Sequence, residues 1–100
     1  MQMNAMDIFQ NEAPDVAKAF DDLIKSLVST TGLDNKTKQL IYIALKAASG
    51  DKAALQFHVP IAKSLGATKE EVRDAILLTL TVCGLTGVTN CLPEAMSVYK

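Results

Sequence analysis

Residues 33–66 read LDNKTKQLIYIALKAASGDKAALQFHVPIAKSLG, and apolar side chains recur in this stretch at intervals of three and four. That period is typical of amphipathic α-helices. An aspartate stands where an N-cap is expected before each of two helices, 37–48 and 52–65. The stretch therefore predicts two successive helices, and the second carries the single histidine of the chain, His58.

The remainder of the chain also predicts helices. Pro14 suits the first turn of an amphipathic helix that runs to about Ser29. Thr68 and Glu71 have the spacing of a capping box at the start of another helix. A final helix could run to about Val98, and no segment alternates apolar and polar residues as a half-buried strand would.

Length and composition fit one small globular domain. The chain has 100 residues, of which 49% are hydrophobic and 21% charged, which is too apolar for a disordered chain. We assign residues 1–12 to an N-terminal lead-in with one helical turn near 6–9, and residues 13–100 to a helical domain. The predicted fold class is all-α, a single-domain bundle of about five to six helices.

Charge and hydropathy limit the classes of partner. Ten basic and eleven acidic residues give a net charge of −1, so no nucleic-acid partner is expected. The segment 75–93 has no charged residue and approaches the length of a membrane span. Its threonines, asparagine and glycines instead favour a buried helix followed by a partner-facing helix, so no membrane partner is expected. The N-terminus lacks a basic region and a long apolar run, which predicts no signal peptide and a cytoplasmic location.

Few residues are suited to chemistry. His58 can be read as a general acid/base, because histidine exchanges protons near neutral pH, or as a packed residue at the edge of a helix. No paired cysteines or acidic cluster accompany it at ligand spacing, so we expect no metal site and no cofactor. Cys83 and Cys91 would lie about 12 Å apart on a continuous helix, too far for a disulfide, and are expected to be small core residues.

Residues 34–92 contain several landmarks in a fixed order. A helix rich in small residues over 40–48 is followed by His58-Val-x-x-Ala-x-x-Leu-Gly, by Ala-Thr-x-Glu-Glu-Val, and by an apolar helix that ends at Gly84. This order resembles the carboxymuconolactone decarboxylase and alkylhydroperoxidase D-like family. The resemblance implies an all-helical protomer that assembles as a homotrimer or homohexamer, with its site on the helix that carries the histidine.

The peroxidase branch of that family carries Cys-x-x-Cys-x-x-x-His, with a glutamate twelve residues before the first cysteine. Here the cysteine positions hold Asp51 and Ala54, and the glutamate position holds Gln39. Neither replacement can form a sulfenic acid or a disulfide. An alkylhydroperoxidase-like thiol antioxidant is therefore the less favoured function, since it would need Cys83 or Cys91.

The decarboxylase branch keeps the histidine without the cysteine pair. The resemblance implies a lyase in which His58 moves a proton while a small organic acid loses its carboxylate. The alternative is a non-catalytic oligomeric binding protein of the same fold. The candidate catalytic residues are His58, Asp51 and Gln39, and the candidate substrate-binding residues are Lys46, Lys52 and Arg73.

Overall fold

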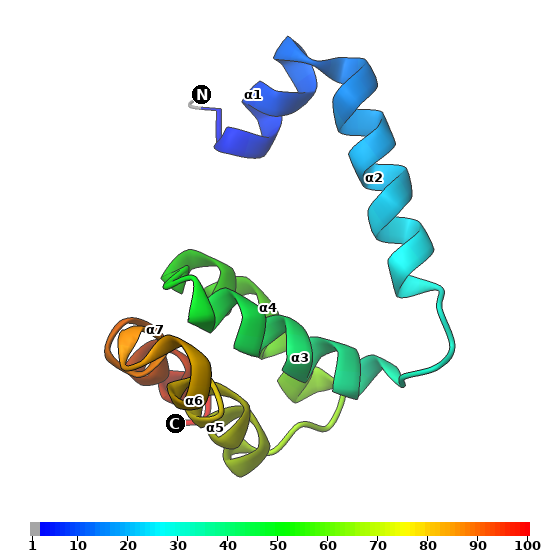
Figure 1. Cartoon of the computed structure of the whole chain (residues 1–100). Helices are drawn as coiled ribbons and strands as arrows, with labels where there is room; N and C mark the ends of the chain where they lie inside the picture. The colour runs from blue at the N-terminus through cyan, green and yellow to red at the C-terminus, as the bar shows by residue number, and fades with distance from the viewer. Residues whose placement is uncertain (1–2) are drawn as a thin grey trace. The chain divides into compact units, whose positions relative to one another are not determined.

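The computed structural model describes residues 3–100, and every regular element in that range is an α-helix (Figure 1). This confirms the predicted all-α class. Six of the helices have eight residues or more, and α6 is a single turn. In chain order the helices are α1 (Ala5–Glu12), α2 (Pro14–Val28), α3 (Asn35–Ala48), α4 (Lys52–Ser64), α5 (Lys69–Leu77), α6 (Leu80–Cys83) and α7 (Thr86–Ser97).

Contacts divide the chain into two compact units, the first extending to Gly32 and the second being Leu33–Lys100. In the first unit, α1 is longer than the single turn expected near residues 6–9. The side chain of Asn4 accepts from the backbone N–H of Asp7 at 2.9 Å, and Asp7 accepts from the backbone N–H of Asn4 at 3.3 Å. This reciprocal capping box satisfies two free donors and lets the helix start early.

The helix α2 begins at Pro14, as predicted, but the first unit has little interior. Ala17 is its one buried residue among those described, and the rings of Phe9 and Phe20 meet edge to face with centroids 6.2 Å apart. Two short helices cannot enclose an apolar stripe on their own. The first unit is therefore helical without having a core.

The core lies in the second unit and draws on α3, α4, α5 and α7. Its largest fully buried side chains are Ile43, Leu55, Val59, Val72, Ile76 and Cys91. Cys91 is buried as predicted, but the same expectation for Cys83 is wrong, because that side chain is exposed. Cys83 is the last residue of the single-turn α6, and Gly84 then turns the chain with φ 68° before α7 begins.

The start of α7 lies against the end of α3. A Cβ atom added to Gly87 would lie 3.1 Å from the carbonyl oxygen of Ala47 and 2.9 Å from Oγ1 of Thr79. Only a residue without a side chain fits this approach. Pro93 lies inside α7.

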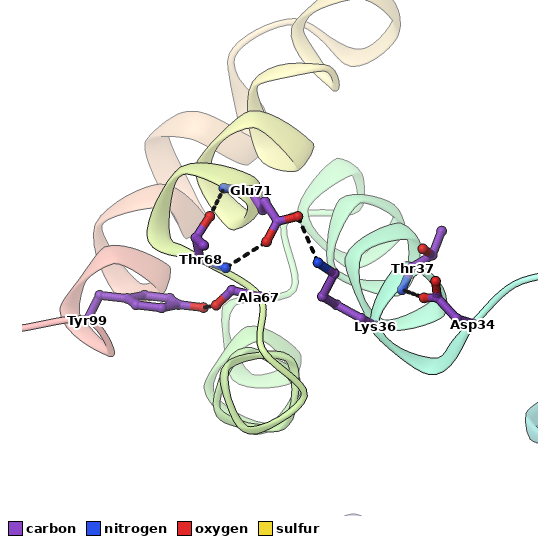
Figure 2. A network of polar contacts seen from close by, with 7 residues as sticks. All are labelled: Asp34, Lys36, Thr37, Ala67, Thr68, Glu71 and Tyr99. Carbon is purple, nitrogen blue, oxygen red and sulfur yellow. Dashed lines mark hydrogen bonds and ion pairs between the residues drawn. The ribbon is translucent and has the colours of Figure 1, made fainter.

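Polar contacts fix the start of α5 within the second unit (Figure 2). The predicted capping box is present: Thr68 N–H donates to Glu71 at 2.8 Å, and Glu71 N–H donates to the Thr68 hydroxyl at 3.1 Å. Lys36 Nζ at the start of α3 donates to the same carboxylate at 3.0 Å. The Tyr99 hydroxyl donates to the carbonyl oxygen of Ala67 at 2.7 Å. The Thr68 N–H and then Lys36 hold the pKa of Glu71 below its usual range.

The uncharged segment 75–93 is divided between α5, α6 and α7, with a turn at Gly84. Within residues 3–100, no helix has both the length and the apolar character that crossing a membrane requires.

Candidate functional site

His58 lies on α4 with its ring against α3. Its Nδ1 is 3.2 Å from Oε1 of Gln39, a residue nineteen positions earlier in the chain. The two helices pack along their apolar stripes through residues such as Ile43 and Val59, which are fully buried. Gln39 and His58 are half-buried at the edges of these stripes, so the packing of the two helices brings these two predicted site residues into contact.

The contact with Gln39 favours one tautomer of the ring. An amide oxygen only accepts hydrogen bonds, so a hydrogen bond between these two atoms requires the proton to be on Nδ1 of His58. In the neutral imidazole the other nitrogen, Nε2, then holds a free lone pair. Gln39 thus orients the ring and selects its tautomer without itself titrating.

Two aromatic rings surround the imidazole. Tyr42 stacks on it with centroids 4.7 Å apart and planes 22° apart, and Phe57 meets it edge-on at 5.1 Å and 89°. Tyr42 and Phe57 were not assigned to the site from the sequence. Tyr42 follows Gln39 by three residues on α3, so its place on the same helix face was a usable signal. Nothing in the sequence distinguishes Phe57, whose side chain is 66% exposed.

The surroundings keep His58 uncharged near neutral pH. Burial, followed by the positive charge of Lys46, lowers the pKa of His58, and Asp51 opposes this shift. Burial acts because a charged ring loses hydration. Lys46 Nζ lies 3.7 Å from Oδ2 of Asp51, while Oδ1 of Asp51 accepts from the Ala54 N–H at 3.1 Å. Asp51 therefore caps α4 as predicted and acts on the imidazole through its charge.

The other predicted substrate-binding cations have acidic partners. Lys52 lies 4.0 Å from Glu94 of α7. Arg73 donates to Asp74 at 2.8 Å, and both acidic groups that raise its pKa, Asp74 and Glu70, belong to α5. Lys46 is the predicted cation that is electrostatically coupled to His58. The substrate-binding roles of all three cations stay predictions.

Other kinds of chemistry find little support in the described chain. Between residues 3 and 100, no three His, Cys, Asp or Glu side chains are grouped so that they could hold a metal ion. Cys83 and Cys91 are both free thiols. Burial raises the pKa of the Cys91 thiol, with a further contribution from Asp51, so this cysteine is poor in the thiolate form that a nucleophile needs.

The chain resembles known proteins over most of its length. The model of the Carboxymuconolactone decarboxylase family matches residues 14–95. Uncharacterized protein MJ0742 of Methanocaldococcus jannaschii is 30% identical over 88 residues, covering 87% of this chain and 85% of the relative. Uncharacterized protein MJ1511 of the same organism is 26% identical over 80 residues, covering 80% and 75% of the two chains. The family match includes His58 and the three residues that contact its ring, Gln39, Tyr42 and Phe57.

Proposed function

We propose that this chain, which belongs to the carboxymuconolactone decarboxylase family, is a decarboxylase-like enzyme acting on a small organic acid. The main support is the setting of His58. Gln39 holds Nδ1 at 3.2 Å, and Tyr42 and Phe57 contact the ring. One ring nitrogen is thereby engaged, which leaves Nε2 to exchange a proton with a substrate.

The proposed step is the protonation of carbon. Loss of CO₂ breaks a carbon–carbon bond and leaves its electron pair on the substrate, where an adjacent carbonyl group can hold it as an enolate. The His58 imidazolium donates its Nε2 proton to that carbon, and a proton from water then restores the imidazolium. Because its pKa is lowered, this imidazolium is a stronger acid than that of an ordinary histidine, but it is scarcer at neutral pH.

Lys46 is the proposed partner for the substrate carboxylate. Its pairing with Asp51 is long, at 3.7 Å, and both side chains are about 40% exposed, so the ammonium group can exchange one carboxylate for another. Lys52 and Arg73 would have to leave Glu94 and Asp74 to assist. A lysine offers a point charge without a bidentate fork, which favours a substrate held by one carboxylate.

The experiment is CO₂ release from a panel of small β-keto and lactone acids by the wild-type chain and by His58→Ala. We expect the variant to lose turnover while it keeps the far-ultraviolet circular dichroism of the folded protein. Gln56→Ala, an exposed change on the same helix, should keep the wild-type rate. Equal CO₂ release by His58→Ala and the wild type would exclude His58 as the proton donor.

The alternative function is a non-catalytic oligomeric binding protein of the same fold. It is favoured by the pairing of each candidate cation with an acidic side chain, so that none of these three cations is left unpaired to polarise a substrate. In that case acids from the panel would shift the His58 resonances without any release of CO₂. A thiol antioxidant activity is the third candidate, and it would appear as thiol-dependent peroxide consumption lost with Cys83 or Cys91.

We also propose that the protein is cytoplasmic and that it assembles with copies of itself as a homotrimer or homohexamer. The family resemblance supports self-assembly, and so do the large apolar side chains that remain exposed in the second unit.

A further inference from the structure

The two tyrosines of the chain are held in different ways. The Tyr99 hydroxyl donates to the carbonyl oxygen of Ala67 at 2.7 Å (Figure 2). The Tyr42 hydroxyl has no hydrogen-bond partner within residues 3–100, although the Tyr42 ring is stacked on His58 with centroids 4.7 Å apart. In the same part of the chain no buried side-chain oxygen lacks a partner, so this hydroxyl is open to solvent. Tyr42 therefore brings an unused hydrogen-bond donor to the candidate site.

Tyr42 lies between two residues that already have a place in the proposed reaction. Gln39, Tyr42 and Lys46 follow one another at intervals of three and four along α3, so they share one side of the helix. At about 1.5 Å of rise per residue, Tyr42 is about 4.5 Å beyond Gln39 and about 6 Å before Lys46 along the helix axis. Gln39 holds Nδ1 of His58, and Lys46 is the proposed partner of the substrate carboxylate. An acid held by Lys46 and protonated by His58 would therefore lie against Tyr42.

The proposed reaction needs a donor that has not yet been assigned. When CO₂ leaves, the electron pair of the broken bond passes to the adjacent carbonyl group, whose oxygen becomes negatively charged. Hydrogen-bond donors placed at such an oxygen lower the barrier of the reaction. Of the three residues that contact the His58 ring, Phe57 has no polar side-chain atom, and Gln39 faces Nδ1 and not the Nε2 that donates the proton. Tyr42 is the third, and its hydroxyl is unpaired in the described part of the chain.

We propose that Tyr42 is a catalytic residue whose hydroxyl donates a hydrogen bond to the substrate carbonyl oxygen as that oxygen becomes an enolate. This role rests on the decarboxylase function proposed above. The electron pair of the broken carbon–carbon bond forms the carbon–carbon double bond of the enolate, and a carbonyl pair moves onto the oxygen beside Tyr42. The Nε2 proton of His58 then forms the new carbon–hydrogen bond as the carbonyl is restored, and water returns a proton to the ring. Tyr42 keeps its own proton throughout, so the net reaction takes up one proton from solvent for each CO₂ released.

The role of Tyr42 limits the class of acid that can react. The carbonyl group must be β to the carboxylate, because only there can its oxygen take up the electron pair of the broken bond. Lys46 offers a point charge and Tyr42 a single donor, so a β-keto acid with one carboxylate satisfies both contacts. A saturated acid such as butyrate has the carboxylate alone, and we expect it to bind without being turned over.

The experiment compares Tyr42→Phe with Tyr99→Phe, because each variant loses one hydroxyl and keeps the ring. The kcat and KM for CO₂ release are measured on the panel of acids, beginning with acetoacetate. We expect kcat to fall at least about tenfold in Tyr42→Phe, with KM and the urea midpoint near those of the wild type. Tyr99→Phe should show the opposite pattern. Its urea midpoint should fall, because the bond to Ala67 is lost, and its kcat should not change.

Two outcomes would overturn the role of Tyr42 and leave the decarboxylase function standing. One is a wild-type kcat in Tyr42→Phe. The other is a fall in kcat that is accounted for by a shifted titration midpoint of His58, followed by nuclear magnetic resonance, because the hydroxyl would then act through the imidazole. A wild-type chain that releases no CO₂ from any acid of the panel would overturn both proposals.

Discussion

The helices α2 and α3 are nearly equal in length, at 15 and 14 residues, and both show apolar periodicity. In α3 the apolar side reaches the core, where Ile43 and Ala47 are fully buried. In α2 only Ala17 is buried, and the stripe of Val16, Phe20, Leu23 and Leu27 stays 44–60% exposed. Periodicity therefore identifies a helix and its apolar side, whereas burial depends on how many other elements of the same unit can cover that side.

The polar sides of the two helices differ as well. Two ion pairs form within α2, Lys18 with Asp22 at 3.1 Å and Lys25 with Asp21 at 3.2 Å, and the four side chains are mainly exposed. Such pairs add little stability. The polar side of α3 instead meets α4, where Gln39 and Tyr42 contact His58. A similar amphipathic pattern thus yields a solvated face in one helix and a candidate site in the other.

The largest predicted effect compares Ile43→Ala in α3 with Leu23→Ala in α2. Ile43 is fully buried, so its truncation leaves a cavity and should lower the free energy of unfolding by about 2–5 kcal/mol. Leu23 is about half exposed, and its truncation should cost less than about 1 kcal/mol. Urea unfolding followed by circular dichroism measures both. Similar losses in the two variants would mean that the α2 stripe is as well covered as the α3 stripe.

A smaller effect is expected from adding a methyl group at Gly87. In Gly87→Ala the new Cβ would lie within about 3 Å of Thr79 Oγ1 and the Ala47 carbonyl oxygen, so α7 must shift away from α3. Strain of this kind costs about 1–3 kcal/mol.

The matched control for this prediction is Gly32→Ala, at the last residue of the first unit. No atom lies within 4 Å of the added Cβ there, and the backbone does not have positive φ. Its unfolding free energy should stay within about 0.5 kcal/mol of the wild type or rise slightly. The urea midpoints of the two variants test the pair, and equal midpoints would show that the α3–α7 approach tolerates a side chain.

Most of the fold could be predicted because local rules and tertiary packing agree. The starts of α2 and α5 follow from Pro14 and from the Thr68–Glu71 capping box, and both were found in the structure. The early start of α1 was missed, although Asn4 and Asp7 have the spacing of a capping box. The exposure of Cys83 was missed, because the apolar helix expected to end at Gly84 is divided into α5 and the single turn α6.

The candidate site was only partly predictable. The resemblance to a family pointed to Gln39, Asp51 and His58, and Gln39 does contact the ring. The stacking of Tyr42 and the edge contact of Phe57 depend on how α3 and α4 are rotated against one another. Those rotations are fixed by buried side chains elsewhere in the two helices, so a local pattern does not reveal them.

The smallest predicted effect tests the polar side of α3 through Gln39→Glu. A carboxylate beside Nδ1 favours the charged imidazolium, so the pKa of His58 should rise in the variant.

In the wild type the lowered pKa means that the unfolded chain binds the proton more readily than the folded one. The contribution of His58 to stability is then present above pH 6.5 and is lost as the pH falls through the lowered pKa. In Gln39→Glu the loss should be smaller if the pKa remains below 6.5, because the folded and unfolded pKa values are then closer, and should reverse sign if the pKa passes that value. Because His58 is the single histidine, its ring protons in an untagged chain report the titration directly by nuclear magnetic resonance.

Gln56→Glu adds the same charge at an exposed position on α4, where solvent screens it, and should leave the titration midpoint of His58 near that of the wild type. Equal midpoints in Gln39→Glu and the wild type would mean that Gln39 does not face Nδ1 in solution, and α3 would then resemble α2 in having a purely solvated polar side.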